Sequence, residues 1–319
     1  MSNYITIDGG TTNTRLRLVK DYLVVAESRL SMGAKDCTGG NEIYKKTIRE
    51  KIEELLIVGN TEEKDIRAII ISGMLTSEFG LFNIPHIAAP AGIKELHGSM
   101  KLMDVGISSI PCYFIPGVKI QSENVYEIDM LRGEECEFVG ISAQMAPNSV
   151  CIMPGSHSKH IYSDEKKRIA SFQSFLSGEM IYAFSKNTIL SKSIDLSITN
   201  FEGEALLAGY DCVKKYGLNR ALFQTRIMDK MLGQSAEALY SFFIGAILCE
   251  EVQTLADCKK QIYICGQRSI RKSMVFLIKK YLSISVTEIE DSKSELAATV
   301  GAIKIFEYKG ECLWIVHCL

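Results

Sequence analysis

The stretch Ile7-Asp8-Gly9-Gly10-Thr11-Thr12-Asn13 is a polar, glycine-bearing turn between two short apolar segments. Tyr4–Ile7 before it and 15–18 after it fit β-strands, and the second segment alternates charged and apolar residues at period two. Glycines let such a turn bring backbone N–H groups close to an anion, and the threonine hydroxyls add donors. An Asp beside the turn can hold Mg²⁺ through water, opposite phosphates. The turn is therefore a candidate phosphate site, with a plain hairpin turn as the alternative.

Further strands and a helix extend this hairpin. Tyr22–Leu30 fits a third strand, and helical spacing follows from Asn41, the expected N-cap. The continuous apolar run Ala68–Ile71 is typical of a strand that is covered on both faces of an α/β sheet.

A second turn, Pro154-Gly155-Ser156-His157, again joins two apolar segments, Val150–Met153 and Lys159–Tyr162. Farther on, Gly266 follows the apolar segment Gln261–Cys265 and precedes a helical pattern. Ligands of open α/β sheets bind at such carboxyl ends of strands. Two hairpin turns and a strand–Gly–helix junction, in this order, are the parts of an actin-like nucleotide cleft. The phosphate-binding pattern G-x-x-x-x-G-K-[ST] does not occur in the sequence.

Length and composition agree with an α/β protein of two lobes. The chain has 319 residues, whereas one domain usually has about 100–200. Each half begins with a β-meander and a glycine turn and continues with alternating helices and strands, which predicts a seam at Ala146-Pro147 and lobes 1–146 and 147–319.

Charge and cysteine usage exclude several classes of protein. Lys and Arg total 36 and Asp and Glu total 38, so we expect neither a nucleic acid nor an anionic membrane as partner. The start lacks the pattern of a signal peptide, and no window of about 18 residues is uncharged and apolar. The 10 cysteines form no CxxC pair, which favours free thiols in a reducing cytoplasm. We therefore expect a cytoplasmic protein.

Five motifs, in order, carry a resemblance to the 2-dehydro-3-deoxygalactonokinase family of the sugar kinase/hexokinase/actin superfamily. They are IDGGTTNTR at 7–15, SGMLTS at 72–77, MLRGEE at 130–135, MPGSHSK at 153–159 and SGE at 177–179. The resemblance implies two actin-like (ribonuclease H-like) lobes with a nucleotide cleft between them. It also implies ATP and Mg²⁺, and phosphorylation of the 6-hydroxyl of 2-dehydro-3-deoxy-D-galactonate. A kinase of another small sugar acid or hydroxy acid, or a non-catalytic nucleotide-binding member, is the alternative.

The resemblance assigns cofactor contacts to both turns. Asp8 is the candidate Mg²⁺ residue, and the adenosine is expected near Gly266 in the C-terminal lobe. The candidate phosphate contacts are Gly10, Thr11, Thr12, Asn13, Gly155, Ser156, His157 and Lys159. For Lys159, an exposed hairpin lysine is the alternative.

The same resemblance places the base and the sugar in the N-terminal lobe. By position Glu134 is the first candidate for the carboxylate that accepts the proton of the attacking hydroxyl, and Glu135 is the second. Acidic residues that merely satisfy the dipole of a helix N-terminus are the alternative. Arg132 and Arg15 are candidates for the sugar carboxylate, with ion pairs or outward side chains as alternatives. The sugar hydroxyls are assigned to Met74, Thr76 and Ser77, with helix capping as the alternative for Thr76 and Ser77.

Three positions depart from the pattern of the family: Gly9 and His160, where it usually has Trp, and Gln267, where it usually has Thr. Because of these departures, the resemblance indicates kinase chemistry more specifically than it indicates the exact sugar acid. The tail 311–319 extends past the pattern, and we expect it on the surface or at a homodimer contact.

Overall fold

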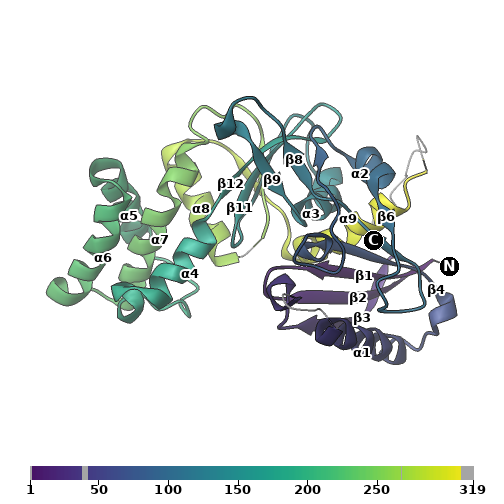
Figure 1. Cartoon of the computed structure of the whole chain (residues 1–319). Helices are drawn as coiled ribbons and strands as arrows, with labels where there is room; N and C mark the ends of the chain where they lie inside the picture. Colours follow the sequence, from purple (N-terminus) through teal and green to yellow (C-terminus); the bar gives the residue numbers. More distant parts are fainter. Residues whose placement is uncertain (1, 38–41, 267, 310–319) are drawn as a thin grey trace. The chain divides into compact units, whose positions relative to one another are not determined.

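The computed structural model describes residues 2–37, 42–266 and 268–309, which form two compact units (Figure 1). Unit 1 contains the described residues of 2–146, 164–171 and 295–309, and unit 2 contains those of 147–163 and 172–294. The separate roles predicted for lobes 1–146 and 147–319 stay predictions. Asn41, Gln267 and the tail 311–319, for which the sequence made predictions, lie outside the described residues.

The large sheet of unit 1 has the strand order β3-β2-β1-β4-β7-β6. β1 pairs antiparallel with β2 and parallel with β4, and β4 pairs parallel with β7. The predicted strands at Tyr4–Ile7 and Ala68–Ile71 are confirmed, and both are longer than predicted. The strands are β1 (Asn3–Gly9), β2 (Thr14–Lys20), β3 (Leu23–Leu30), β4 (Ile66–Gly73), β6 (Lys101–Leu102) and β7 (Cys112–Phe114).

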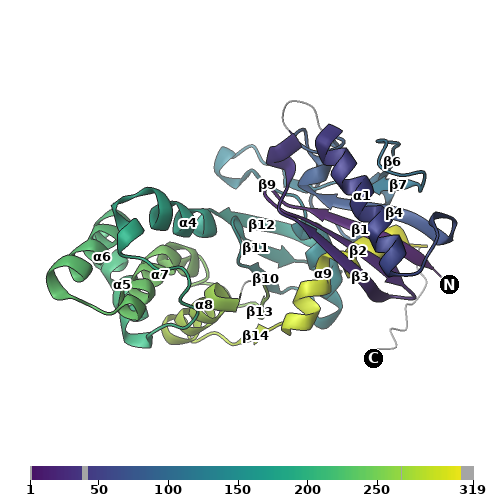
Figure 2. The ribbon, with the colours of Figure 1, turned by 90° about the horizontal axis from the view of Figure 1, so that it is seen from below.

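The two faces of this sheet have different chemistry because side chains alternate along a strand. Ile5 and Ile7 face α1 (Glu42–Val58) and pack in one core with its buried residues. Thr6 lies on the opposite face, where its hydroxyl is 3.2 Å from that of Thr299 on α9 (Asp291–Phe306). Figures 1 and 2 show α1 and α9 on opposite sides of β1 and β2.

Glycines let α9 approach α3 (Glu134–Ile141) closely. A Cβ atom at Gly301 would lie 1.8 Å from the carbonyl oxygen of Cys136, and one at Gly140 would lie 2.0 Å from that of Ala297. Real Cβ atoms do not come so close to backbone, so both helices depend on these glycines for their contact. The position of α3 matters because its first turn carries the candidate catalytic carboxylates.

A small sheet with the order β5-β8-β9 completes unit 1, together with α2 (Ile93–Ser99). β5 (Ile87–Ala88) pairs parallel with β8 (Val118–Ile120), and β8 pairs antiparallel with β9 (Asp129–Leu131). The sequence did not predict this sheet, since two- and three-residue strands are too short to show a period.

Unit 2 combines a sheet of order β12-β11-β10-β13-β14 with a group of helices. β10 pairs parallel with β13, so the predicted phosphate turn after β10 and Gly266 after β13 lie at the same edge of the sheet. The first residues of β12 belong to the segment 164–171, which is part of unit 1. The strands are β10 (Val150–Met153), β11 (Ser158–Ser163), β12 (Ile169–Phe175), β13 (Ile262–Ile264) and β14 (Val286–Glu288). The helices are α4 (Ser177–Asn187), α5 (Gly203–Tyr216), α6 (Leu218–Leu232), α7 (Ala236–Gln253) and α8 (Arg268–Tyr281).

α7 is the most enclosed of these helices, with buried residues on all its sides. It packs against α5 and α6, which lie beside it in Figures 1 and 2. Its apolar character therefore reflects a protein core. Within the described part of the chain, no helix is both long and apolar enough to cross a bilayer.

The contact between α3 and α9 gives a test of the fold. We expect Gly301→Ala to lower the thermal unfolding midpoint by about 3–10 °C, because the new methyl group forces the helices apart. Gly98→Ala on α2 is the matched control, since a Cβ atom there meets nothing within 4 Å. Equal, small shifts for both variants in a thermal melt would contradict the close packing described above.

Candidate active site

The first predicted phosphate turn is exposed, and the backbone of the turn and of Gly33 fixes its conformation. The N–H of Gly10 donates to the carbonyl of Asn13 at 2.8 Å, which closes the turn. Gly33 lies against it so closely that a Cβ atom there would be 2.5 Å from the carbonyl oxygen of Thr11. Residues 10–13 are all exposed. Their backbone and hydroxyl groups are therefore accessible to a ligand, as the sequence predicted.

Three glycines bring separate segments together beside Asp8. A Cβ atom at Gly73, at the end of β4, would lie 2.3 Å from the carbonyl oxygen of Gly9 and 3.1 Å from Oδ1 of Asp8. Gly133, at the N-terminus of α3, would place its own Cβ atom 3.3 Å from the Cα atom of Gly73. Gly73 and Gly133 have φ angles of +73° and +109°, which glycine adopts without strain. The carboxyl ends of β1 and β4 thus meet the start of α3.

Acidic groups gather at this junction. Burial raises the pKa of Asp8, and the charge of Glu134 adds to that effect, whereas the charges of Arg15 and Arg17 oppose it. Burial, with the charges of Asp8 and Glu134, raises the pKa of Glu137 to about 8. A cation placed here would relieve the repulsion among these carboxylates.

Glu134 and Glu135, the two candidate bases, have different environments. The N–H of Arg132 donates to Oε2 of Glu134 at 2.9 Å, and this side chain is only half-buried. Glu135 is fully buried and accepts a hydrogen bond from the N–H of Gly133 at 2.7 Å. Burial, with the charge of Glu134, raises the pKa of Glu135 to about 8. Of the two, Glu134 is the carboxylate that a substrate can reach.

Arg132 uses its guanidinium to join segments of unit 1. Nη1 donates to the carbonyl and the hydroxyl of Thr76, and Nη2 donates to the carbonyl of Ile84 at 2.8 Å. Nη2 also lies 3.2 Å from Nδ1 of His86. Two of its three nitrogens are thus bonded to protein. Binding of the sugar carboxylate by Arg132 stays a prediction. In the structure its guanidinium holds the segments of Thr76, Ile84 and His86 together.

The predicted sugar-binding segment after β4 forms a short 3₁₀ turn, Met74–Thr76. The hydroxyl of Thr76 donates to the carbonyl of Gly73 at 3.0 Å, and that of Ser77 donates to the carbonyl of Met74 at 2.7 Å. Both residues are buried, and their hydroxyls bond back to the backbone of the turn. Met74 is half-buried. Sugar binding by these three residues stays a prediction.

Arg15 faces the acidic junction from β2, where it pairs with Asp8 across the hairpin. Its Nε is buried and has no hydrogen-bond partner among the described residues. A buried donor of this kind suits an anionic ligand better than an outward, solvated side chain.

In unit 2 the second predicted phosphate turn is braced by α4. A Cβ atom at Gly178 would lie 2.1 Å from the carbonyl oxygen of Gly155, and the N–H of Glu179 donates to the carbonyl of Ser156 at 3.0 Å. His157 lies 3.1 Å from Oε1 of Glu179. At Gly155 itself a Cβ atom would meet nothing within 4 Å. The turn is therefore fixed from one side and open at Gly155.

A buried carboxylate on α7, Glu251, supports the same turn. The hydroxyls of Ser158 on β11 and Ser177 on α4 donate to its two oxygens, and Nε2 of His160 lies 3.2 Å from Oε1. Burial alone would raise the pKa of Glu251, but these hydrogen bonds and the charge of His160 lower it. The sequence analysis missed Glu251, and its only signal was an acidic residue within an apolar helix.

Lys159 and Gly266 complete the predicted contacts of unit 2. Lys159 is buried, so the exposed lysine that the sequence left as an alternative is wrong, and its Nζ donates to the carbonyl of His157 at 3.2 Å. Gly266 has a φ angle of +86°, and a Cβ atom there would lie 2.8 Å from the carbonyl oxygen of Pro154. The parallel pairing of β10 with β13 thus brings Gly266 next to the second turn.

The residues fit a magnesium ion held mainly through water. Among the described residues, no group of three or more His, Cys, Asp or Glu side chains is arranged to hold a metal directly. Mg²⁺ dehydrates reluctantly and is commonly bound by one or two carboxylates plus phosphates. Asp8, beside the exposed first turn, offers such a carboxylate.

Comparisons with known proteins give a family match and related sequences. A sequence model of the family described as 2-keto-3-deoxy-galactonokinase matches residues 8–304. The chain is 25% identical over 275 residues to the 2-dehydro-3-deoxygalactonokinase of Escherichia coli strain K12, and the match covers 84% of each chain. It is 28% identical over 238 residues to a probable 2-dehydro-3-deoxygalactonokinase, DgoK1, of Rhizobium meliloti strain 1021, which covers 72% of this chain and 71% of that protein.

A solved structure from Sinorhizobium meliloti, described provisionally as a 2-dehydro-3-deoxygalactonokinase protein, superposes with a TM-score of 0.77 at 20% identity. The match covers 95% of this chain and 97% of the other. Component A of the (R)-2-hydroxyglutaryl-CoA dehydratase of Acidaminococcus fermentans superposes with a TM-score of 0.51 at 14% identity. These likenesses confirm the α/β fold predicted from the sequence.

The buried Glu251 gives a stability test. We expect Glu251→Ala to lower the free energy of unfolding by about 2–5 kcal/mol, because it leaves Ser158, Ser177 and His160 without their buried acceptor. Glu250→Ala, at the exposed neighbouring position, is the control. Chemical denaturation of both variants checks this, and equal midpoints would show that the network contributes nothing.

Glu135 gives a pH test. Its pKa is raised from 4.5 to about 8 by folding, so the folded state keeps a proton that the unfolded state loses. This group therefore makes folding less favourable as pH rises through that window. Glu135→Gln cannot ionise, so its thermal midpoint relative to wild type should rise steadily between pH 5 and pH 8. The exposed Glu123→Gln should show no such trend, and a flat difference for Glu135→Gln would rule out a raised pKa.

Proposed function

The chain belongs to the 2-keto-3-deoxy-galactonokinase family, and we propose that it transfers the γ-phosphate of ATP to the 6-hydroxyl of 2-dehydro-3-deoxy-D-galactonate. The observation that carries this proposal is the family match over residues 8–304, which includes the junction of Asp8, Gly73 and Glu134. That junction supplies what phosphoryl transfer needs from a protein, namely positioning and charge stabilisation.

We assign the general base to Glu134. Its half-buried carboxylate is oriented by the N–H of Arg132, and it is assigned to accept the proton of the 6-hydroxyl. The raised pKa of Glu135 keeps that neighbour largely protonated at neutral pH. A protonated Glu135 leaves Glu134 as the candidate carboxylate for the proton transfer.

Phosphate binding is assigned to each turn on its own geometry. In unit 1 the exposed groups of residues 10–13 offer backbone and hydroxyl donors, and the buried Nε of Arg15 adds a charged donor nearby. In unit 2 Gly155 leaves room for close approach, and Ser156, His157 and Lys159 follow it in the same turn and strand. Gly266, beside Pro154, is assigned to the adenosine. Donors of this kind stabilise the charge that develops on the transferred phosphoryl group.

Asp8 would hold Mg²⁺ through water at the acidic junction. When bound, the ion would neutralise phosphate charge and oppose the burial and the charge of Glu134, which together raise the pKa of Asp8. The residues of the chain then have two tasks, to place the 6-hydroxyl against Glu134 and to hold the phosphates at the turns.

A kinase of another sugar acid is the second candidate, because Gly9, His160 and Gln267 depart from the pattern of the family. A non-catalytic nucleotide-binding protein is disfavoured by the accessible Glu134 beside Asp8. An ADP-release assay with a panel of sugar acids separates these readings. We expect 2-dehydro-3-deoxy-D-galactonate to give the highest kcat/KM, and ADP release no greater than that in buffer would overturn the proposal.

The assignment of the base predicts the behaviour of Glu134→Gln. Its kcat should fall by about 10²–10⁴-fold, because the hydroxyl loses its proton acceptor, while ATP still binds. Glu123→Gln, an exposed acidic residue of unit 1, should keep the wild-type kcat. Steady-state kinetics and ATP titration of both variants check this. Full turnover by Glu134→Gln would move the role to another carboxylate.

A further inference from the structure

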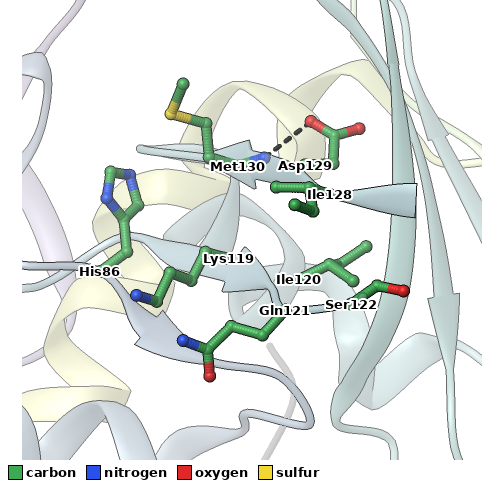
Figure 3. Close-up of a pocket in the computed structure, with 8 residues that line it drawn as sticks. All are labelled: His86, Lys119, Ile120, Gln121, Ser122, Ile128, Asp129 and Met130. Atoms are coloured by element: carbon green, nitrogen blue, oxygen red, sulfur yellow. Dashed lines mark hydrogen bonds between the residues drawn. The ribbon is translucent and has the colours of Figure 1, made fainter. Parts of the chain in front are cut away.

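A cavity of about 520 Å³ lies on the small sheet of unit 1, outside the residues assigned so far (Figure 3). It is formed by β8, β9 and the residues that flank them, together with His86, which directly precedes β5. The side chains that line it are His86, Lys119, Ile120, Gln121, Ser122, Ile128, Asp129 and Met130. Five of these eight side chains are charged or can donate or accept hydrogen bonds, so the cavity suits a small polar ligand.

His86 contributes a neutral hydrogen-bond donor. Its Nδ1 lies 3.2 Å from Nη2 of Arg132, and because a guanidinium only donates, Nδ1 must be the unprotonated acceptor. The ring proton is then on Nε2. Burial, together with the charges of Arg132 and Lys119, lowers the pKa of His86 to about 4, so the ring stays neutral near pH 7. The ring also packs over Gly117, where a Cβ atom would lie 2.6 Å from Cδ2.

Lys119 contributes the positive charge of the cavity. Its charge lowers the pKa of His86, and both residues line the cavity. The backbone carbonyl of Lys119 accepts a hydrogen bond from the N–H of Ala89 at 2.9 Å, whereas its ammonium forms no ion pair with another residue in the described ranges. Gln121 is two residues farther along the chain, so its side chain points to the same side. Figure 3 shows the ends of Lys119 and Gln121 on the same side of the strand, next to His86, whose ring points toward Met130.

The opposite end of the cavity is acidic. The carboxylate of Asp129 accepts a hydrogen bond from the N–H of Met130 at 2.7 Å. In Figure 3 it is directed away from the ammonium of Lys119. The cavity thus has a donor-rich cationic end and an acceptor end that suits hydroxyl groups.

Arg132 connects this cavity to the proposed base. Its backbone N–H donates to Glu134, whereas its guanidinium contacts His86. The cationic end of the cavity and Glu134 are therefore separated by about the span of one arginine side chain. This span is comparable to the length of a sugar acid from its carboxylate to its terminal hydroxyl.

We propose that the cationic end of this cavity binds the carboxylate of the sugar-acid substrate, with Lys119 and His86 as specificity-determining residues. One full positive charge beside neutral donors matches a singly charged carboxylate. The proposal rests on the proposed kinase function, because the terminal hydroxyl of the same molecule must reach Glu134. It predicts a preference for a sugar acid over a neutral sugar.

The test pairs a variant with a change in the substrate. Lys119→Met and wild type are assayed with 2-dehydro-3-deoxy-D-galactonate and with its methyl ester, which lacks the negative charge. For the acid, the variant should raise KM by about 10–100-fold and leave kcat within about threefold of wild type. For the ester, both enzymes should give similar KM values. Lys119→Arg should restore most of the affinity for the acid, and Lys101→Met, an exposed lysine on β6, should behave as wild type.

The outcomes separate this proposal from the kinase function. If wild type phosphorylates the acid and Lys119→Met raises KM equally for acid and ester, or for neither, the carboxylate site is wrong and the kinase function stands. A fall in kcat alone would also overturn the site, since carboxylate binding acts on KM. If wild type does not phosphorylate the acid at all, the proposed function fails, and the site proposal fails with it. Thermal midpoints of the variants exclude unfolding as the cause of any loss.

Discussion

The close approach of glycine backbone at Gly9, Gly73 and Gly133 is the constraint on which the candidate site of unit 1 depends. Any side chain at Gly73 would meet the carbonyl of Gly9, and it would come within 3.1 Å of Asp8. Because the three segments touch, the end of β1, the end of β4 and the start of α3 share one acidic junction. The contact of α3 with α9 through Gly140 and Gly301 keeps that junction in place. The pKa shifts of Glu135 and Glu137 follow from the same crowding.

The sequence predicted most of this framework because its signals are local. The hairpin of β1 and β2, the buried strand β4 and the parallel pair β10 and β13 all follow from period, apolar runs and glycine turns. β14 begins only at Val286, after Ser283, whose φ angle of +53° lies outside the β region. The motifs at the ends of these strands also identified the family, which the match over residues 8–304 confirms.

What the sequence did not predict depends on contacts between distant segments. Glu251 binds partners 74 to 93 residues away, and only the fold shows that it supports the second turn. The accessibility of Glu134 and the burial of Glu135 could not be separated by position, since the two are neighbours in one helical turn. Lys119 lies on a strand too short to show a pattern, and His86 directly precedes another such strand. Arg132, which was expected to face the substrate, holds Thr76 and His86.

The central claim is that the chain phosphorylates the 6-hydroxyl of 2-dehydro-3-deoxy-D-galactonate. The most direct test is phosphorus–proton correlation NMR of the product formed from this acid and ATP. The account predicts one new phosphate ester whose phosphorus couples to the protons on carbon 6. Coupling to protons on any other carbon, or no sugar phosphate at all, would contradict it.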